Sequence, residues 1–110
     1  MSPLLWVLLI AGLGAVLLTR RIRSGRRITA FRARGAVVVD VRTPGEFRQG
    51  HAPGAINLPL DQLGHQARKL DTARLILVCC ASGARSAVAA RMLREKGFDT
   101  FNAGSWTRLR

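Results

Sequence analysis

The chain has 110 residues, a formal net charge of +12 and 48% hydrophobic residues. This length allows one small domain. Its only cysteines, Cys79 and Cys80, are neighbours, which excludes a disulfide framework because adjacent cysteines cannot join distant segments. A reduced compartment is therefore expected. The two histidines, His51 and His65, are scattered and supply no metal-ligand spacing, so we expect neither a metal nor a cofactor.

The chain begins with an apolar run over residues 3–18 that carries no charge. A membrane-spanning helix needs about 20 apolar residues, with about 17 as the lower limit. We expect residues 1–22 to form a transmembrane anchor. A cleaved signal peptide is less consistent with the pattern, because no basic residue precedes the run and several follow it. A buried core helix is the other alternative, and so small a domain has little core to hide one.

A basic cluster follows the apolar run, and we expect residues 23–27 to be a juxtamembrane linker. The cluster consists of Arg20, Arg21, Arg23, Arg26 and Arg27. Basic residues after a span favour the cytoplasmic side for the following segment. We therefore expect a single-pass membrane protein whose catalytic domain, residues 28–110, lies in the cytoplasm. The remaining basic excess either lies on a solvated surface or attracts small anions. Nucleic acid is not an expected partner, because no aromatic residues are interleaved with the basic ones.

Residues 28–110 alternate between helical segments and short apolar runs that are typical of buried strands. Strands are expected over residues 36–41, 55–58, 75–79 and 98–102. Helices are expected over residues 28–34, 61–70 and 84–96, with a single turn at 46–48. Gly35 and Gly97 are expected to end the first and last of these helices. The alternation predicts an α/β fold in which helices flank a parallel sheet and the site lies at the carboxyl ends of the strands.

The segment after the third expected strand places a nucleophile before the start of a helix. Gly83 permits left-handed dihedral angles, and small neighbours let the main chain approach closely. The helix expected from Ala84 directs its free amides at the same point. Cys80 is therefore the candidate nucleophile, stabilised as a thiolate or persulfide, although an inert buried thiol is the alternative. Cys79 lies within the strand and is expected to be a small core residue.

Three segments resemble motifs of the rhodanese family. The run Cys80-Ala-Ser-Gly-Ala-Arg-Ser86 resembles its active-site loop, Cys-Arg-Ser-Gly-x-Arg-Ser in many single-domain members. Further matches are Asp40-Val41-Arg42, Glu46-Phe47, Gly50 to Asn57, Gly97-Phe98 and Asn102 to Trp106. Together these motifs cover about residues 28–106. The chain departs from the pattern at Ala81, where the common arginine would contact an anion, and at Ala52, where a branched apolar residue is usual.

The resemblance implies a parallel sheet flanked by helices and a ping-pong sulfur transfer of the thiosulfate sulfurtransferase type. Cys80 would take sulfur from a small anionic donor as a persulfide and pass it to a thiol, a protein acceptor or cyanide. The loop residues that would hold the persulfide and substrate are Ala81, Ser82, Gly83, Ala84, Arg85 and Ser86. Arg85 would hold the loop and the incoming anion, or form only a structural ion pair.

Four polar residues are expected to tie together the loops beside the site, mainly as structural elements: Asp40, Arg42, Glu46 and His51. Two other functions compete with sulfur transfer. A membrane-tethered binding or regulatory module without turnover is one, although such a module has no need of Cys80. A cysteine phosphatase or arsenate reductase is the other, and the spacing of Cys80 and Arg85 is one residue shorter than in related phosphatases.

Overall fold

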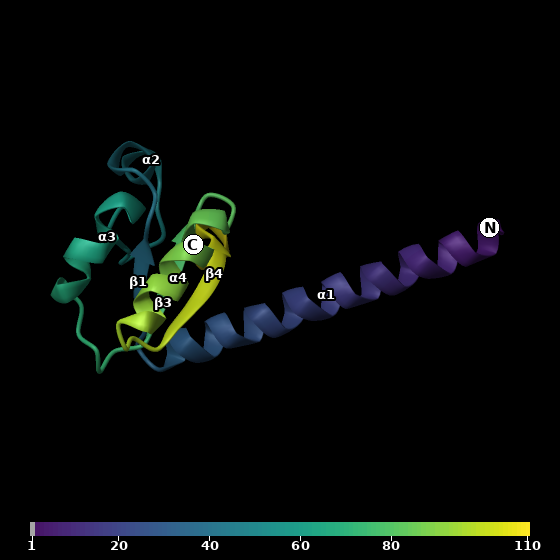
Figure 1. Ribbon diagram of the computed structural model, residues 1–110, viewed down its shortest axis with the longest axis horizontal. Helices are drawn as coiled ribbons and strands as arrows, with labels where there is room; N and C mark the ends of the chain where they lie inside the picture. Colours follow the sequence, from purple (N-terminus) through teal and green to yellow (C-terminus); the bar gives the residue numbers. More distant parts are fainter. Residues whose placement is uncertain (1) are drawn as a thin grey trace.

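In the computed structural model, which describes residues 2–110, four parallel strands form a sheet in the order β2-β1-β3-β4 (Figure 1). The strands are β1 (Val37–Asp40), β2 (Ile56–Asn57), β3 (Ile76–Cys80) and β4 (Thr100–Ser105). The apolar, β-branched composition of β1 and β3 suits strands that are covered on both faces. The predicted α/β fold with a parallel sheet is confirmed.

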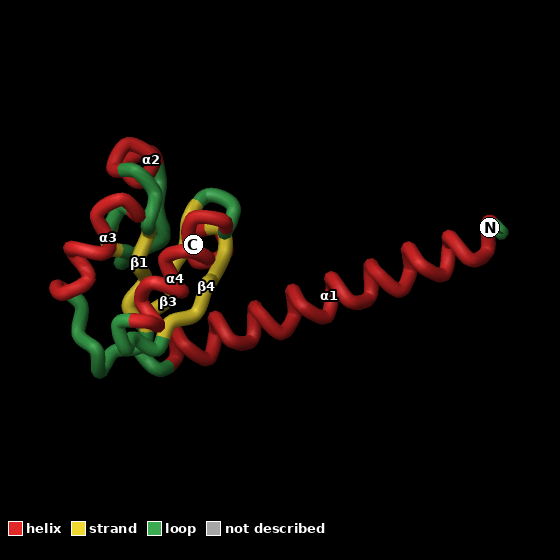
Figure 2. Tube along the Cα trace, viewed as in Figure 1, coloured by secondary structure: helices red, strands yellow, loops and turns green. Residues whose placement is uncertain are grey.

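Helices cover both faces of the sheet (Figure 2). On one face lie α3 (Leu60–Gln66), the short 3₁₀ helix η1 (Ala67–Lys69) and α4 (Ala84–Glu95). On the other face lie the last turns of α1 (Pro3–Ala33) and the 3₁₀ helix η2 (Trp106–Leu109). The expected turn at 46–48 belongs to α2 (Pro44–Gln49), which follows β1.

Each face of the sheet has its own apolar core. The core beneath α3 and α4 includes Val39, Leu63, Ile76, Val78, Cys80, Ala90 and Leu93. The core beneath α1 and η2 includes Ile28, Phe31, Val38, Leu77, Cys79, Ala103 and Leu109. Successive residues of a strand point to opposite faces, so the two adjacent cysteines belong to different cores.

α1 is one continuous helix of 31 residues, whereas the sequence suggested an anchor, a linker at 23–27 and a separate helix at 28–34. The linker segment is helical because arginine favours helix and Gly25 costs only about 1 kcal/mol there. Ile28 and Phe31, one turn apart, then pack the end of this helix on the sheet. Gly35 ends α1 in the left-handed region, at φ 77°, as predicted.

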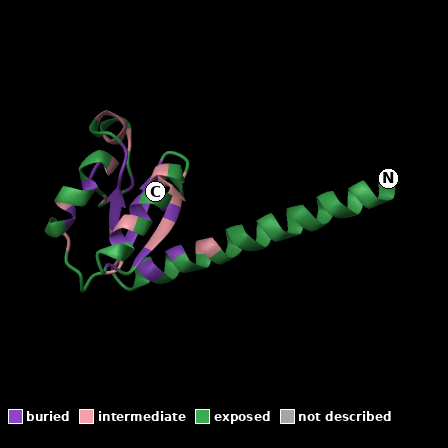
Figure 3. Cartoon of the chain, viewed as in Figure 1, coloured by how far each residue is buried: buried purple, intermediate pink, exposed green. Residues whose placement is uncertain are grey.

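The apolar part of α1 is exposed, and the part after the arginine cluster is docked (Figure 3). The most apolar 18-residue window of α1 has a mean hydropathy of 1.9 and 0% of it is buried. The buried-core alternative for this segment is therefore wrong. The helix is long and apolar enough to cross a membrane, and a leader sequence would have the same character.

β4 runs from Thr100 to Ser105 rather than over residues 98–102. Phe98 instead closes the turn after α4, where its amide donates to the Leu93 carbonyl. Asn102 pairs with Val78 but Gly104 pairs with Cys79, so the register shifts here and the residue between them is extra. This β-bulge lies beside the Cys80 loop, where bulges commonly re-aim a side chain.

Candidate active site

Cys80 ends β3 and lies directly before the loop that opens α4. Its Sγ accepts hydrogen bonds from the backbone amides of Gly83 at 3.0 Å and Ser86 at 3.4 Å. The Ser86 hydroxyl lies 3.4 Å from the same sulfur. Gly83 makes this tight loop possible with φ 103°, and an added Cβ would lie 3.2 Å from the Cα of Gly104. The loop therefore gathers polar hydrogens around one sulfur at a helix start, an arrangement that favours an anion.

The two cysteines have pKa values shifted in opposite directions. Burial raises the pKa of the Cys80 thiol. The Ser86 side chain and the amides of Ser86, Gly83 and Ser82 lower it by more than burial raises it, so the net pKa is lowered. In the free thiol the Ser86 hydroxyl proton goes to Asn102 Oδ1, so this hydroxyl donates to the sulfur only when it turns towards the thiolate. Burial raises the pKa of Cys79 to about 12, and the charge of Asp40 adds to this. Cys80 is thus the residue prepared to be a thiolate. Its side chain is fully buried, while Ser82 in the loop is exposed.

Asn102 connects β4 to the Cys80 loop. Its Oδ1 accepts a hydrogen bond from the Ser86 hydroxyl at 2.6 Å and from the Gly104 amide at 2.9 Å. Its Nδ2 donates to the Gly83 carbonyl at 3.2 Å. The sequence placed Asn102 in a family motif but indicated no role in the site. Its signal was a polar side chain inside a strand, at a half-buried position, and its partners include Gly104 at the β-bulge.

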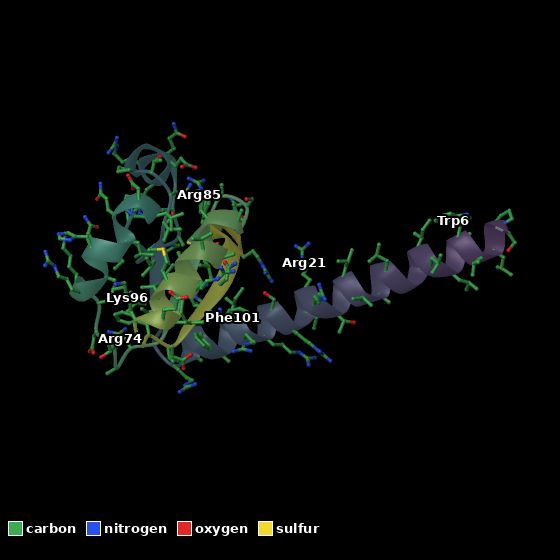
Figure 4. The ribbon with its side chains drawn as sticks, viewed as in Figure 1. Trp6, Arg21, Arg74, Arg85, Lys96 and Phe101 are labelled. Atoms are coloured by element: carbon green, nitrogen blue, oxygen red, sulfur yellow. The ribbon has the colours of Figure 1, made fainter. Side chains whose placement is uncertain are left out.

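Arg85 lies in the first turn of α4 (Figure 4). It forms an ion pair with Glu46 of α2. Its Nη1 and Nη2 donate to the two carboxylate oxygens of Glu46 at 2.7 and 2.9 Å. The Arg85 guanidinium, followed by the Thr43 amide, lowers the pKa of Glu46 to about 2. The structural ion pair, one of the two roles considered for Arg85, is present. The Arg85 side chain is 38% exposed, so it remains accessible from solvent.

Asp40 and Arg42 form a second ion pair, which is buried at the end of β1. The Asp40 carboxylate accepts from Arg42 Nε at 3.0 Å and Nη2 at 2.7 Å. Arg42 Nη2 also donates to the Gly50 carbonyl at 2.6 Å, and its guanidinium lies 4.8 Å from the Trp106 ring centroid. This pair therefore connects β1 to the loop after α2 and to η2.

His51 stands apart from the sulfur. Its ring stacks on Phe47 with centroids 3.8 Å apart, and its Nδ1 lies 2.9 Å from the Phe47 carbonyl oxygen. It is exposed, and the hydrogen bonds to Cys80 come from the loop and Ser86 instead. Of the predicted loop residues, Gly83 and Ser86 lie within hydrogen-bond distance of the sulfur of the free thiol. Roles for Ala81, Ala84 and Arg85 toward a persulfide stay predictions.

Two pockets flank the Cys80 loop. A pocket of 280 Å³ borders Arg85 and is lined otherwise by Val41, Thr43, Pro59, Leu60 and Asp61. A pocket of 490 Å³ borders Ser82, and its other lining residues are Arg20, Arg21, Gly104, Ser105, Thr107 and Arg108. A further pocket near Lys96 belongs to the other end of α4, since Figure 4 shows Arg85 and Lys96 at opposite ends of that helix.

Comparison with known proteins identifies the family of the chain. The model of the rhodanese-like domain family matches residues 27–108. The chain belongs to the rhodanese family. As a rhodanese, it is 42% identical over 69 residues to the protein YqhL of Bacillus subtilis. It is 39% identical over 67 residues to thiosulfate sulfurtransferase GlpE of Shewanella oneidensis. It also resembles a structure described as rhodanese with anions from E. coli, with a TM-score of 0.62 and 32% identity.

The chain spans only part of the length of the two curated relatives that it matches. The matches span 61% of this chain in both sequence comparisons, and 55% of YqhL and 66% of GlpE. The E. coli comparison covers 67% of this chain and 91% of that structure. Together with the family match, the relatives named as sulfurtransferases support sulfur transfer as the general activity.

Proposed function

We propose that this rhodanese is a membrane-anchored sulfurtransferase of the thiosulfate sulfurtransferase type, which carries sulfur as a persulfide on Cys80. The observation that carries the proposal is the pair of hydrogen bonds that the Gly83 and Ser86 amides donate to Cys80 Sγ, which help to lower its pKa. An ordinary cysteine is only about 3% thiolate at pH 7. Because the thiolate is the nucleophile, a lowered pKa makes sulfur capture faster at neutral pH.

The proposed reaction has two displacements at sulfur. The Cys80 thiolate attacks the outer sulfur of thiosulfate, a new S–S bond forms to Cys80, and sulfite leaves with the electron pair of the broken S–S bond. A thiolate of a small molecule or protein then attacks the outer sulfur of the persulfide and releases the Cys80 thiolate. The bonds and charges balance in each step, so no cofactor is required.

In this proposal the residues from Ala81 to Ser86 hold the outer sulfur of the persulfide, and Arg85 contacts the anionic donor. The amides of Gly83 and Ser86 already donate to the inner sulfur, and the α4 dipole adds a favourable field. An alanine at position 81 lacks the positive charge common in the family, so we expect thiosulfate to be a poor donor. The E. coli relative described with anions supports an anionic donor for this chain.

For its location, we propose that α1 crosses the membrane once and leaves residues 28–110 in the cytoplasm. The exposed apolar run followed by arginines supports this arrangement. Protease added to sealed right-side-out vesicles should leave the domain intact, whereas protease added to inverted vesicles should digest it. Digestion in both, or only in the right-side-out vesicles, would reject the topology.

Intact mass spectrometry tests the sulfur-carrying role directly. The full chain in detergent is incubated with thiosulfate, and its mass should increase by one sulfur atom. Cys80→Ser is the matched control and should gain none. Adding a thiol should return the wild-type mass to its starting value while the thiol becomes a persulfide. A wild-type chain that gains no sulfur from thiosulfate or from a polysulfide would contradict the proposal.

One observation favours a second function, a membrane-tethered docking module without turnover. The Cys80 side chain is fully buried in the free thiol form, so a donor reaches the sulfur only if the loop from Ala81 to Ser86 moves. The mass experiment separates the two functions, because a docking module would keep the mass of the free thiol with every donor.

A further inference from the structure

The pocket of 490 Å³ beside Ser82 is basic and is built from three separate parts of the chain. Arg20 and Arg21 come from α1, Arg108 comes from η2, and Ser82 with Gly104 comes from the active-site region. Arg108 is held between η2 and α1, because its Nη1 donates to Ser24 Oγ at 2.9 Å and its Nη2 donates to the Arg21 carbonyl at 3.4 Å. Figure 4 shows the Arg21 side chain projecting from α1, after the apolar run over residues 3–18 has ended.

The arginines of this pocket have no carboxylate partners within residues 2–110. The ion pairs of that part of the chain join Asp40 to Arg42 and Glu46 to Arg85. No acidic residue lines the pocket, whose other walls are glycine, serine and threonine. Three neighbouring guanidinium groups without counter-charges create a positive potential that attracts anions. Guanidinium groups also match the geometry of carboxylates and oxyanions.

The pocket adjoins the sulfur site through shared residues. Ser82 lines the pocket, and it precedes Gly83, whose amide donates a hydrogen bond to Cys80 Sγ at 3.0 Å. Gly104 lines the pocket too, and it contacts the other side of the loop at Gly83. Within the loop itself, Arg85 is paired with Glu46 and position 81 is alanine. Arginines without a carboxylate partner therefore share a pocket with the loop, and they are supplied by α1 and η2.

We propose that this pocket binds the anionic part of a low-molecular-weight persulfide donor that carries two or more negative charges, such as a peptide thiol with free carboxylates. The inference rests on the proposed sulfur transfer. A volume of 490 Å³ falls within the range of small-molecule sites and exceeds what thiosulfate alone would fill. With the anion held there, the Cys80 thiolate attacks the outer sulfur of R–S–SH, the persulfide forms on Cys80, and the thiolate R–S⁻ leaves.

An anionic lipid headgroup shares this chemistry, because the pocket lies next to the apolar part of α1. Arg20 also borders a second surface pocket formed by Ala15, Val16, Thr19 and Arg23. We place the donor in the Ser82 pocket because its walls include residues of the active-site loop, whereas the pocket around Ala15 contains none. The two sources of negative charge are separated by testing the protein in bilayers with and without anionic lipid.

The test compares two double variants of the full chain that remove the same charge from the same helix. Arg20→Ala with Arg21→Ala removes pocket residues, and Arg23→Ala with Arg26→Ala removes arginines outside this pocket. Each protein in neutral phosphatidylcholine nanodiscs is given glutathione persulfide, an anionic donor, or the persulfide of 2-mercaptoethanol, a neutral one. The pocket variant should raise KM for glutathione persulfide about tenfold. Its kcat and its use of the neutral donor should stay unchanged, as should both donors in the control variant.

A binding measurement keeps the pocket testable if no donor is processed. Glutathione sulfonate, which cannot transfer sulfur, is titrated calorimetrically into Cys80→Ser with and without the pocket substitutions. We expect about tenfold weaker binding without the two arginines. Absence of turnover with intact binding would reject the proposed sulfur transfer and keep the pocket. Equal KM values or equal binding in the two double variants would reject the pocket. A difference that arises only in nanodiscs with phosphatidylglycerol would assign the arginines to lipid and overturn the donor site.

Discussion

The two adjacent cysteines of β3 lie on opposite faces of the sheet, and only one of them has the surroundings of a reactive residue. Cys80 faces α4, where loop amides and the Ser86 hydroxyl surround its sulfur and lower its pKa. Cys79 faces α1 and η2, where Phe31 and Leu109 surround it and burial raises its pKa to about 12. Both side chains are fully buried. Burial alone therefore does not decide whether a cysteine is reactive; the hydrogen-bond donors around the sulfur do.

The largest expected effect comes from replacing each of the two cysteines by serine. Cys80→Ser should abolish sulfur transfer from thiosulfate to cyanide, because a serine hydroxyl does not form a persulfide. Cys79→Ser should keep most of the activity and lose some stability, because a buried hydroxyl without a partner costs about 1–3 kcal/mol. Circular dichroism checks that both variants fold. Equal loss of activity in two folded variants would mean that the two cysteines have been assigned the wrong roles.

The next effect concerns the face of the sheet that α1 and η2 cover. Phe31 is 7% exposed, and its ring centroid lies 5.9 Å from that of Phe101. Phe31→Ala should lower the free energy of unfolding by about 3–5 kcal/mol, the usual cost of truncating a buried phenylalanine. Ile22→Ala is the control on the same helix, where the side chain is 48% exposed. Chemical denaturation in detergent measures both. Similar losses in the two variants would show that α1 is not docked at Phe31.

How far the sequence predicts this structure depends on how local each feature is. β1, β3 and α4 follow from local patterns, and Gly35 and Gly97 end their helices through their own φ values, 77° and 95°. The position of Cys80 before a helix start is equally local. The continuous α1 was missed at residues 23–27, where the arginine cluster and Gly25 suggested a linker although arginine favours helix. That Ile28 and Phe31 then pack on the sheet is a tertiary contact.

The partners that the sequence does not predict in the site are all tertiary. Arg85 and Glu46 are 39 residues apart, and nothing in either local sequence indicates that they pair. Asn102 reaches Ser86 and Gly83 from a strand that carries a β-bulge, and register shifts are not visible in a single sequence. The basic pocket requires α1 to lie against η2, 87 residues further along the chain at the Arg108–Arg21 contact.

The next prediction removes one polar group beside the Cys80 sulfur, on the side of the sheet that α4 covers. Ser86→Ala removes the hydroxyl at 3.4 Å from Cys80 Sγ and should raise the Cys80 pKa, because this hydroxyl can then no longer turn from Asn102 Oδ1 and donate to the thiolate. At pH 7 less thiolate is present, so the second-order rate of sulfur capture should fall about tenfold. The rate should recover as the pH is raised. Thr100→Val is the control, since its buried hydroxyl bonds to the Phe98 carbonyl instead. A pH profile that does not move would exclude Ser86 as a stabiliser of the thiolate.

The smallest expected effect concerns the ion pair between Arg85 and Glu46. Arg85 either contacts the donor or only ties α4 to α2, and Glu46→Gln distinguishes these roles because it releases the guanidinium without removing it. Arg85→Ala should raise KM for thiosulfate several-fold and leave a neutral polysulfide unaffected, whereas Glu46→Gln should leave both donors unchanged. Equal losses with both variants would make the pair purely structural.

The free energy of unfolding gives an independent readout of the same ion pair. The pKa of Glu46 is lowered from 4.5 to about 2, so the pair stabilises the fold fully above pH 4.5 and loses its effect as the pH falls towards 2. The stability difference between wild type and Glu46→Gln should therefore be constant near neutral pH and shrink only across that acid range. A difference that shrinks near pH 7 instead would mean that another group controls it.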